Sequence, residues 1–243
     1  MNRFYAVLIA LALCLALFLQ QAWSGGTLKA GATKELCLAL DTEPQTLDPI
    51  AIADTLSDGV AHKCYNTLVR LERDESNKLV VKPELTESFN ISPDGKIYTF
   101  QLRKGVRFHN GREMKASDAE YSLRRLLASP MSKRSDWIKP FVKDSEAYFK
   151  SRGEGRVGIR ATGDYELTIE LEAPFAPFIQ HLCTINCAVV AREAAEDKTK
   201  IFSRTPVGTG PFKLIEWIVN SSFISNAMTT IFAASRSSTH CVS

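Results

Sequence analysis

The sequence lacks any strong excess of charge, and its basic and acidic residues are mixed along the chain. Its 243 residues include 30 Lys and Arg against 27 Asp and Glu, a formal net charge of +3. Nucleic-acid and acidic membrane partners require clustered basic residues, so neither is indicated. With 45% hydrophobic residues, the composition is that of a globular protein with one large core or two small ones.

The motifs of common enzyme chemistry are also missing. The sequence contains no Gly-x-Ser-x-Gly elbow, no His-Glu-x-x-His pair and no phosphate-binding glycine loop. No nucleophile stands beside a recognisable base. His62 and His109 have no companion at metal-ligand spacing, so surface or hydrogen-bonded core roles are expected for them. The chain is therefore not predicted to be an enzyme, and no cofactor or metal is expected.

Cysteine pairs at the spacing of structural zinc sites are missing too, although the chain has six cysteines. His181, Cys183 and Cys187 could be taken for a metal site, but zinc pairs usually show tighter spacing and a second pair elsewhere. Core packing is therefore favoured for them. Cys37 and Cys64 fall on a predicted strand and a predicted helix and are expected to be small buried residues. The disulfide state of these cysteines is open.

What is present begins with an export signal. An unbroken apolar run at 4–19 is followed by Ala22 and Ser24, the two small residues of a cleavage site after Ser24. The run is shorter than the ~20 apolar residues of a bilayer span, so 1–24 is predicted to be a cleaved signal peptide. The mature protein would be soluble and periplasmic. An uncleaved anchor and a lipid attached at Cys14 are the weaker alternatives.

The richest local pattern lies between residues 85 and 127. Residues 92–95 read Ser-Pro-Asp-Gly, a turn signal because proline presets φ and glycine tolerates positive φ. The stretch that follows, 98–103, alternates apolar and polar residues as a half-buried strand does. Together with Phe89 and Ile91 before the turn, it predicts a β-hairpin.

A second short strand and a helix follow the hairpin. Asn110-Gly111 closes a predicted strand at 106–108. Ser117 and Glu120 have the spacing of a capping box, and Ser129-Pro130 ends the helix. The apolar stripe of this helix consists of Ala119, Leu123, Leu126 and Leu127.

Helices and strands are also predicted elsewhere in the chain, which gives an α/β fold class with mixed (α+β) sheets. The predicted elements are a strand at 35–40, a helix at 54–71, a helix at 144–150, a hairpin of 157–161 with 167–171, a helix after Pro177, a buried strand at 188–191 and a helix at 192–197.

The block at 94–111 resembles a signature of one protein family. It contains every residue of the pattern DGxxYTFxLRKGVxFHxG, which is similar to that of the family 5 solute-binding proteins, the oligopeptide, dipeptide and nickel receptors of ATP-binding-cassette (ABC) importers. The segment TEPQTLDP at 42–49 and the segment PVGTGPFK at 206–213 resemble two further stretches of that family. The resemblance covers residues 35–217.

The resemblance implies a fold, a function and partners. Residues 25–217 would form the N-terminal lobe of a class II periplasmic-binding-protein-like fold. The family captures a short peptide or similar solute between two lobes by hinge closure and delivers it to an inner-membrane ABC permease. A monomer is expected. Peptides are the default solute, although relatives carry nickel chelates, haem or oligosaccharides. An inert fragment or interaction protein and an exported enzyme with a binding-protein-like lobe are the alternatives.

Residues 218–243 differ in composition from the rest of the chain. They contain one charged residue, Arg236, and many Ser, Thr and Ala, whereas family members continue at this point into a second lobe. An aberrant or disordered tail is therefore predicted, on a truncated gene product that lacks the second lobe and has impaired binding. A natural short form with a disordered end is the alternative.

Two segments are predicted to line the solute site. The candidate ligand-binding residues are Glu43, Gln45, Thr46, Leu47, Gly208, Thr209 and Gly210. The first four follow a sheet strand, where open α/β sheets bind ligands. The last three form a glycine-rich turn that lets a ligand or an opposing strand approach the backbone closely. A purely turn-forming role is the alternative for both segments, and the block at 85–127 is predicted to be a folding unit and not a contact site.

Overall fold

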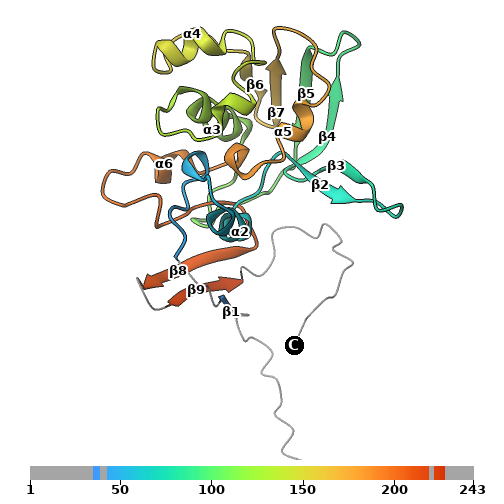
Figure 1. The fold of residues 1–243 in the computed structure, drawn as a ribbon. Helices are drawn as coiled ribbons and strands as arrows, with labels where there is room; N and C mark the ends of the chain where they lie inside the picture. The colour runs from blue at the N-terminus through green and yellow to red at the C-terminus, as the bar shows by residue number, and fades with distance from the viewer. Residues whose placement is uncertain (1–34, 39–42, 219–221, 228–243) are drawn as a thin grey trace, which may run out of the picture. The chain divides into compact units, whose positions relative to one another are not determined.

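Three antiparallel sheets organise the fold in the computed structural model (Figure 1), which describes residues 35–38, 43–218 and 222–227 and the side chains of 43–217. The central sheet has the spatial order β4 (Thr86–Ile91), β5 (Ile97–Leu102), β7 (Glu166–Glu170), β6 (Ile159–Gly163). A hairpin joins β2 (Val69–Arg73) to β3 (Leu79–Pro83), and the third sheet has the order β1 (Glu35–Leu38), β9 (Ser222–Ala227), β8 (Phe212–Ile218).

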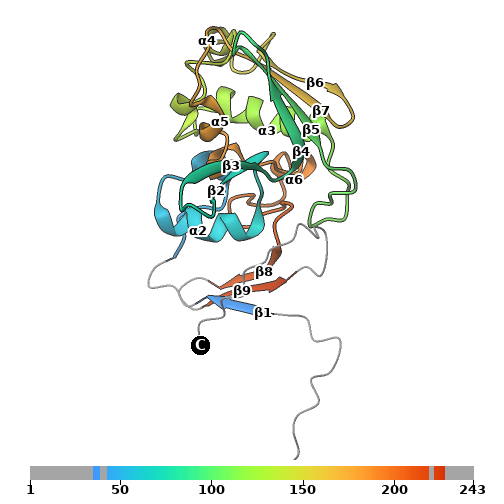
Figure 2. The same cartoon turned by 90° about the vertical axis from the view of Figure 1, so that its right-hand side faces the viewer.

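Short helices connect and cover the sheets. They are α2 (Thr55–Cys64), α3 (Ala116–Ala128), α4 (Ser145–Lys150), α5 (Phe178–His181) and α6 (Arg192–Ala195), with 3-10 turns η1 (Pro49–Ala51), η2 (Ser135–Trp137) and η3 (Ile185–Cys187). Helix α3 lies against the central sheet, next to β6 and β7 (Figure 2). Within the part of the chain that the structure describes, no helix is long and apolar enough to cross a membrane.

The predicted hairpin at 85–103 is confirmed. The N–H of Gly95 donates to the carbonyl of Ser92 at 2.8 Å, and the glycine has φ +70°. Tyr98 and Phe100 of β5 are buried, whereas Gln101 is exposed, as the alternation predicts. The predicted hairpin of β6 with β7 is also confirmed, with slightly different ends.

Helix α3 is confirmed, but the predicted capping box is wrong. The helix begins at Ala116, two residues earlier than that box requires, and the Asp118 carboxylate accepts the N–H of Lys115 at 2.9 Å. Glu120 instead accepts the N–H of Ala161 at 2.8 Å and so ties α3 to the central sheet. The apolar stripe of α3 is buried as predicted, and the helix ends at Ala128, directly before the predicted stop at Ser129-Pro130.

The predicted helix at 54–71 is too long. Helix α2 ends at Cys64, and Val69 already belongs to β2. Between them, the N–H and hydroxyl of Thr67 donate to the Glu84 carboxylate at 2.9 and 3.0 Å. These bonds hold an extended backbone and override the helical spacing of the apolar residues.

Two predicted strands are extended segments outside any sheet. At 106–108 the structure has only an isolated bridge between Arg107 and Glu113. The segment at 188–191 is buried as predicted, but its N–H groups bond to loops and a side chain, such as Val189 to the Asn66 carbonyl at 3.0 Å. A buried apolar run can therefore satisfy its backbone without a ladder.

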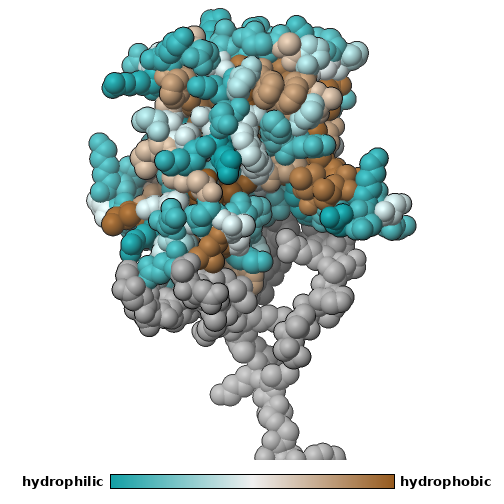
Figure 3. Space-filling model, viewed as in Figure 1, coloured by the Kyte–Doolittle hydropathy of each residue, from teal (hydrophilic) through white to brown (hydrophobic). Residues whose placement is uncertain are grey.

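The buried residues form two clusters, one of the two arrangements that the composition allows. The first lies between the central sheet and α3, and it contains the aromatic residues of the 94–111 block, Tyr98, Phe100 and Phe108. The second surrounds α2 and includes Leu47 and Tyr65, with Leu214 and Trp217 of β8 packed against it. Hydrophilic residues are spread over the visible surface, with hydrophobic patches between them (Figure 3).

Part of the stretch 218–243 is structured. Ile218 ends β8, and Ser222–Ala227 forms β9 between β1 and β8 in the third sheet. Residues 219–221 and 228–243 lie outside the described residues, as does the predicted signal peptide at 1–24. Residues 39–40 of the predicted first strand also lie outside them, and the described part, Glu35–Leu38, is β1.

Candidate functional site

The segment at 43–49 is anchored by a buried ion pair. The Asp48 carboxylate accepts two hydrogen bonds from the Arg125 guanidinium of α3, at 2.7 and 2.5 Å. The side chains of Asp48 and Arg125 are only 7% and 19% exposed. This pairing holds the pKa of Arg125 above its usual value against the opposing effect of burial. The segment is therefore fixed to the helix of the 85–127 block by a charge-assisted bidentate contact.

Backbone bonds fix the rest of the segment. The N–H of Gln45 donates to the Ser57 hydroxyl at 3.0 Å, and the N–H of Leu47 donates to the Ser203 carbonyl at 2.8 Å. Leu47 is fully buried in the second core, whereas Gln45 is exposed and Glu43 and Thr46 are half-buried. Of the four predicted site residues here, Leu47 is an anchor of the segment and Gln45 presents its side chain outward.

The glycine-rich turn packs against the C-terminal end of α2. A Cβ on Gly208 would lie 2.2 Å from the Cys64 carbonyl oxygen, and one on Gly210 would lie 2.4 Å from the Cys64 carbonyl carbon. The N–H of Gly210 donates to that same carbonyl at 2.9 Å. Thr209 is 5% exposed, and its hydroxyl donates to Asn66 at 3.0 Å. The close approach predicted for this turn is made by α2.

His109 holds the turn from its other side. The backbone N–H of His109 donates to the Gly208 carbonyl at 2.8 Å, and the ring atom Nε2 lies 3.0 Å from the Gly210 carbonyl. Burial lowers the pKa of His109, with a smaller contribution from the nearby charge of Lys213. The predicted hydrogen-bonded core role is confirmed for His109. His62, for which a surface role was the other expectation, is exposed.

The two predicted site segments lie at opposite ends of α2. The segment at 43–49 bonds to Ser57 in its first turn, whereas the 208–210 turn packs on Cys64, its last residue. Ten residues of α-helix span about 15 Å. The structure therefore does not bring all seven predicted residues into one constellation, and their ligand-binding role stays a prediction.

Sequence reasoning missed the residues that position these segments. Arg125 and Ser57 carry no motif of their own, and Asn186 donates to the carbonyls of Pro49 and Ile52 at 2.7 and 3.0 Å from 134 or more residues away. Only the long-range packing of the chain reveals such partners. No signal within the local sequence identifies them.

The cysteines of the described region are packed side chains. Cys64 and Cys187 are buried, as expected for Cys64, and burial raises the pKa of each thiol to about 12. The thiol of Cys183 donates to the Ile179 carbonyl, and that of Cys187 to the His181 carbonyl, each at 3.6 Å. Among the residues that the structure describes, no three His, Cys, Asp or Glu side chains are grouped so that they could hold a metal ion.

The three sheets and their covering helices have the fold of a periplasmic-binding-protein lobe. The substrate-binding domain of an oligopeptide ABC transporter from Bacillus anthracis superposes with a TM-score of 0.67 at 29% identity, over 76% of this chain and 36% of the other. The periplasmic binding protein DppA from Helicobacter pylori, in complex with the peptide STSA, superposes with a TM-score of 0.59 at 28% identity. That match covers 76% of this chain and 37% of the other.

Sequence comparison gives the family. Residues 80–227 match the family model of bacterial extracellular solute-binding proteins, family 5 Middle. The chain belongs to this family. It is 31% identical to the dipeptide-binding protein DppE of Bacillus subtilis, over 78% of this chain and 35% of that protein. It is also 31% identical to the glutathione-binding protein GsiB of Escherichia coli K12, over 77% and 33%. The chain thus spans about a third of the length of these relatives.

Proposed function

We propose that this chain supplies one wall of the solute-binding cleft in an exported receptor that captures short peptides for an ABC importer. The names of the relatives support the class of solute, since they are dipeptide-binding, glutathione-binding and oligopeptide-transport proteins. Delivery to an inner-membrane permease and the absence of a catalytic step are part of the same proposal.

One observation carries the proposal for this chain. The segment at 43–49 is held by Arg125, Ser57 and Ser203, yet it leaves the Gln45 side chain exposed. A backbone that is fixed before the ligand arrives loses little conformational entropy on binding, so its exposed side chains can contribute directly to affinity. The segment is therefore suited to form the rim of the cleft.

Because one lobe provides only part of a closing cleft, we propose that the 243-residue chain by itself binds peptide more weakly than a two-lobe receptor. Hinge closure contributes affinity through contacts on both sides of the solute. The runner-up function is an interaction protein or fragment that binds no peptide. Export and removal of 1–24, with a monomeric product, complete the proposal, and the N-terminal sequence and molar mass of the exported product test them.

Calorimetric titration with a pool of di- to pentapeptides tests the proposed function. Heat of binding in the wild-type chain that weakens in Gln45→Ala supports it. Gln180→Ala is the matched control, because Gln180 is exposed and its side chain lies on α5. If Gln45→Ala and Gln180→Ala bind peptide with equal affinity, the segment at 43–49 is not the rim of the cleft. A folded chain without any heat of binding would favour the fragment.

A further inference from the structure

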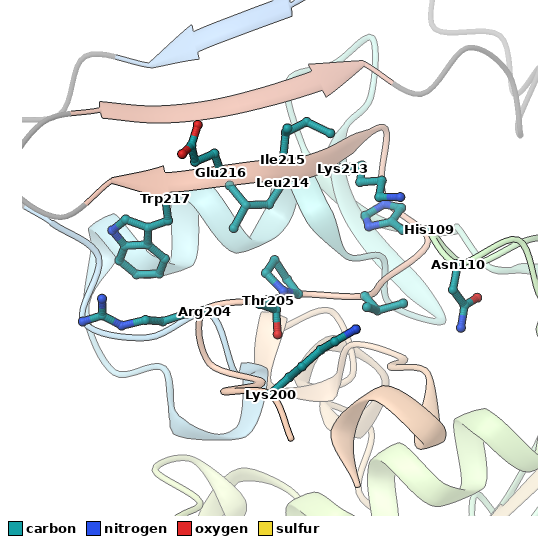
Figure 4. A pocket seen from close by; sticks show the side chains of 12 residues that line it. His109, Asn110, Lys200, Arg204, Thr205, Lys213, Leu214, Ile215, Glu216 and Trp217 are labelled. Carbon is teal, nitrogen blue, oxygen red and sulfur yellow. The ribbon is translucent and has the colours of Figure 1, made fainter. Parts of the chain in front are cut away.

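A groove runs between β8 and the loop that precedes the glycine-rich turn (Figure 4). Its volume is about 510 Å³, within the ~300–1,000 Å³ that small-molecule sites occupy. We call it the β8 groove, and the residues that define it here are His109, Lys200, Arg204, Lys213, Leu214 and Trp217.

Three cations line the β8 groove without a paired carboxylate. Lys200, Arg204 and Lys213 are exposed, and none has a carboxylate within 4 Å among the side chains of 43–217. Arg192, in contrast, pairs with Glu196 at 3.0 Å. The groove is thus a locally positive concavity on a protein of nearly balanced charge.

Two carboxylates near the groove are directed elsewhere. Asp197 feels the charge of Lys200, but its carboxylate accepts the N–H and hydroxyl of Thr199 at 2.9 and 2.6 Å. Glu216 belongs to the lining, but its side chain is on the opposite side of β8 from Leu214 (Figure 4). Neither neutralises the cations.

The charges lie at both ends of the groove, with apolar surface between them. Lys200 and Lys213 extend toward the His109 end, whereas Arg204 lies beneath Trp217 at the other end (Figure 4). The guanidinium of Arg204 is 5.1 Å from the centroid of the Trp217 ring, a cation–π contact that holds it in place. Leu214 lines the groove between the two ends.

We propose that the β8 groove binds a small organic anion with at least two carboxylate groups. One carboxylate would meet the two lysines, the other would meet Arg204, and the carbon skeleton would cover Leu214 and the indole of Trp217. A single inorganic anion is too small to reach both ends. The ring nitrogens of His109 face the Gly208–Gly210 backbone, so this side chain is a wall of the groove. None of the residues 43–49 of the proposed peptide rim belongs to the lining of the groove.

Titration with citrate and with inorganic phosphate, at constant ionic strength and in the full chain, tests this inference. A Trp23→Phe, Trp137→Phe background leaves Trp217 as the reporter, because the chain has three tryptophans. Citrate should change the Trp217 emission in a saturable way and should bind at least about tenfold more tightly than phosphate, since one further charge-assisted contact strengthens binding by about a factor of ten or more.

Matched charge variants locate the site. Lys200→Gln with Lys213→Gln should weaken citrate binding about tenfold or more. Lys78→Gln with Lys133→Gln removes the same charge from exposed positions outside the groove and should leave the affinity unchanged. Equal losses in both pairs, equal affinity for citrate and phosphate, or a Trp217 emission that citrate does not change would each overturn the proposal. The peptide titration does not depend on any of these outcomes.

Discussion

The ion pair between Asp48 and Arg125 should be among the most consequential polar contacts of the lobe. Asp48→Asn keeps the shape of the side chain and removes its charge, which leaves the guanidinium without a carboxylate. Breaking a buried pair in this way costs about 3–5 kcal/mol, because the remaining charge stays desolvated. Arg125 retains 19% exposure and lies 5.4 Å from the Phe202 ring. We therefore expect about 3 kcal/mol, the lower end of that range.

A double-mutant cycle separates the broken pair from the lost packing. Asp48→Leu and Arg125→Met should each cost a similar amount, since each leaves one charge of the pair buried without its partner. The double variant Asp48→Leu with Arg125→Met replaces both charges by apolar side chains and should recover most of the loss, because buried ion pairs are often no better than apolar packing. The size of the recovery measures how much of the single-variant cost is unpaired charge.

Urea unfolding of the full chain provides the measurement. Each variant should lower the midpoint without changing the slope of the transition, which reports the surface exposed on unfolding. Glu196→Gln is the matched control, because its partner Arg192 is on the surface, with side-chain exposures of 50% and 64%. That substitution should cost only about 0.3–0.5 kcal/mol. Single variants of the buried pair that cost no more than this control would refute the reasoning.

Three further predictions concern two glycines in or next to α2, the buried His109 and the buried cysteines. Gly208→Ala should destabilise the lobe by about 1–3 kcal/mol, because its Cβ would meet a carbonyl oxygen at 2.2 Å. Gly59→Ala, on the exposed face of α2 with nothing within 4 Å, should instead stabilise the lobe by about 0.5–1 kcal/mol. Urea unfolding midpoints check both signs. The folded-state pKa of His109 lies below the ordinary 6.5. The contribution of His109 to folding stability is therefore present above pH 6.5 and is lost as the pH falls through 6.5 toward the folded pKa. His109→Asn should flatten the pH dependence of the unfolding free energy between pH 7 and 5. Cys64 and Cys187, with pKa values of about 12, are ionised to only about one part in ten thousand at pH 8. A thiol reagent should therefore modify them at the rate of unfolding, once the half-buried Cys183 and the cysteines with side chains outside 43–217 are replaced by serine.

Local chemistry makes the hairpin and α3 predictable from sequence. The turn at 92–95 and the alternation of β5 depend on neighbours within a few residues, and so does the apolar stripe of α3. Residues 65–68 were mispredicted as helix because the competing partner, Glu84, is 17 residues away from Thr67. Propensity and periodicity describe a segment alone, and a distant carboxylate overrides them.

The candidate site was predictable only in part, for the same reason. The 43–47 segment could be placed after a strand, but the burial of Leu47 depends on the second core, to which distant residues such as Phe202 contribute. The glycines at 208 and 210 indicate a close approach to the backbone, and only the fold shows that Cys64 makes it. Sequence patterns indicate which kind of contact a segment requires, and tertiary packing determines which residues make that contact.

The three segments that resemble the family are locked to one another. Asp48 of the first segment pairs with Arg125 of α3, the helix that follows the 94–111 block. His109 of that block lies within hydrogen-bond distance of the glycine-rich turn in the third segment. Each contact joins residues at least 77 positions apart, so the 94–111 block and the helix after it link the first segment to the third. The three family-like motifs therefore specify the scaffold, because each contact between two of these segments constrains the residues on both sides. In the receptor that we propose, solute choice falls to outward side chains such as Gln45, which that scaffold positions without fixing their identity.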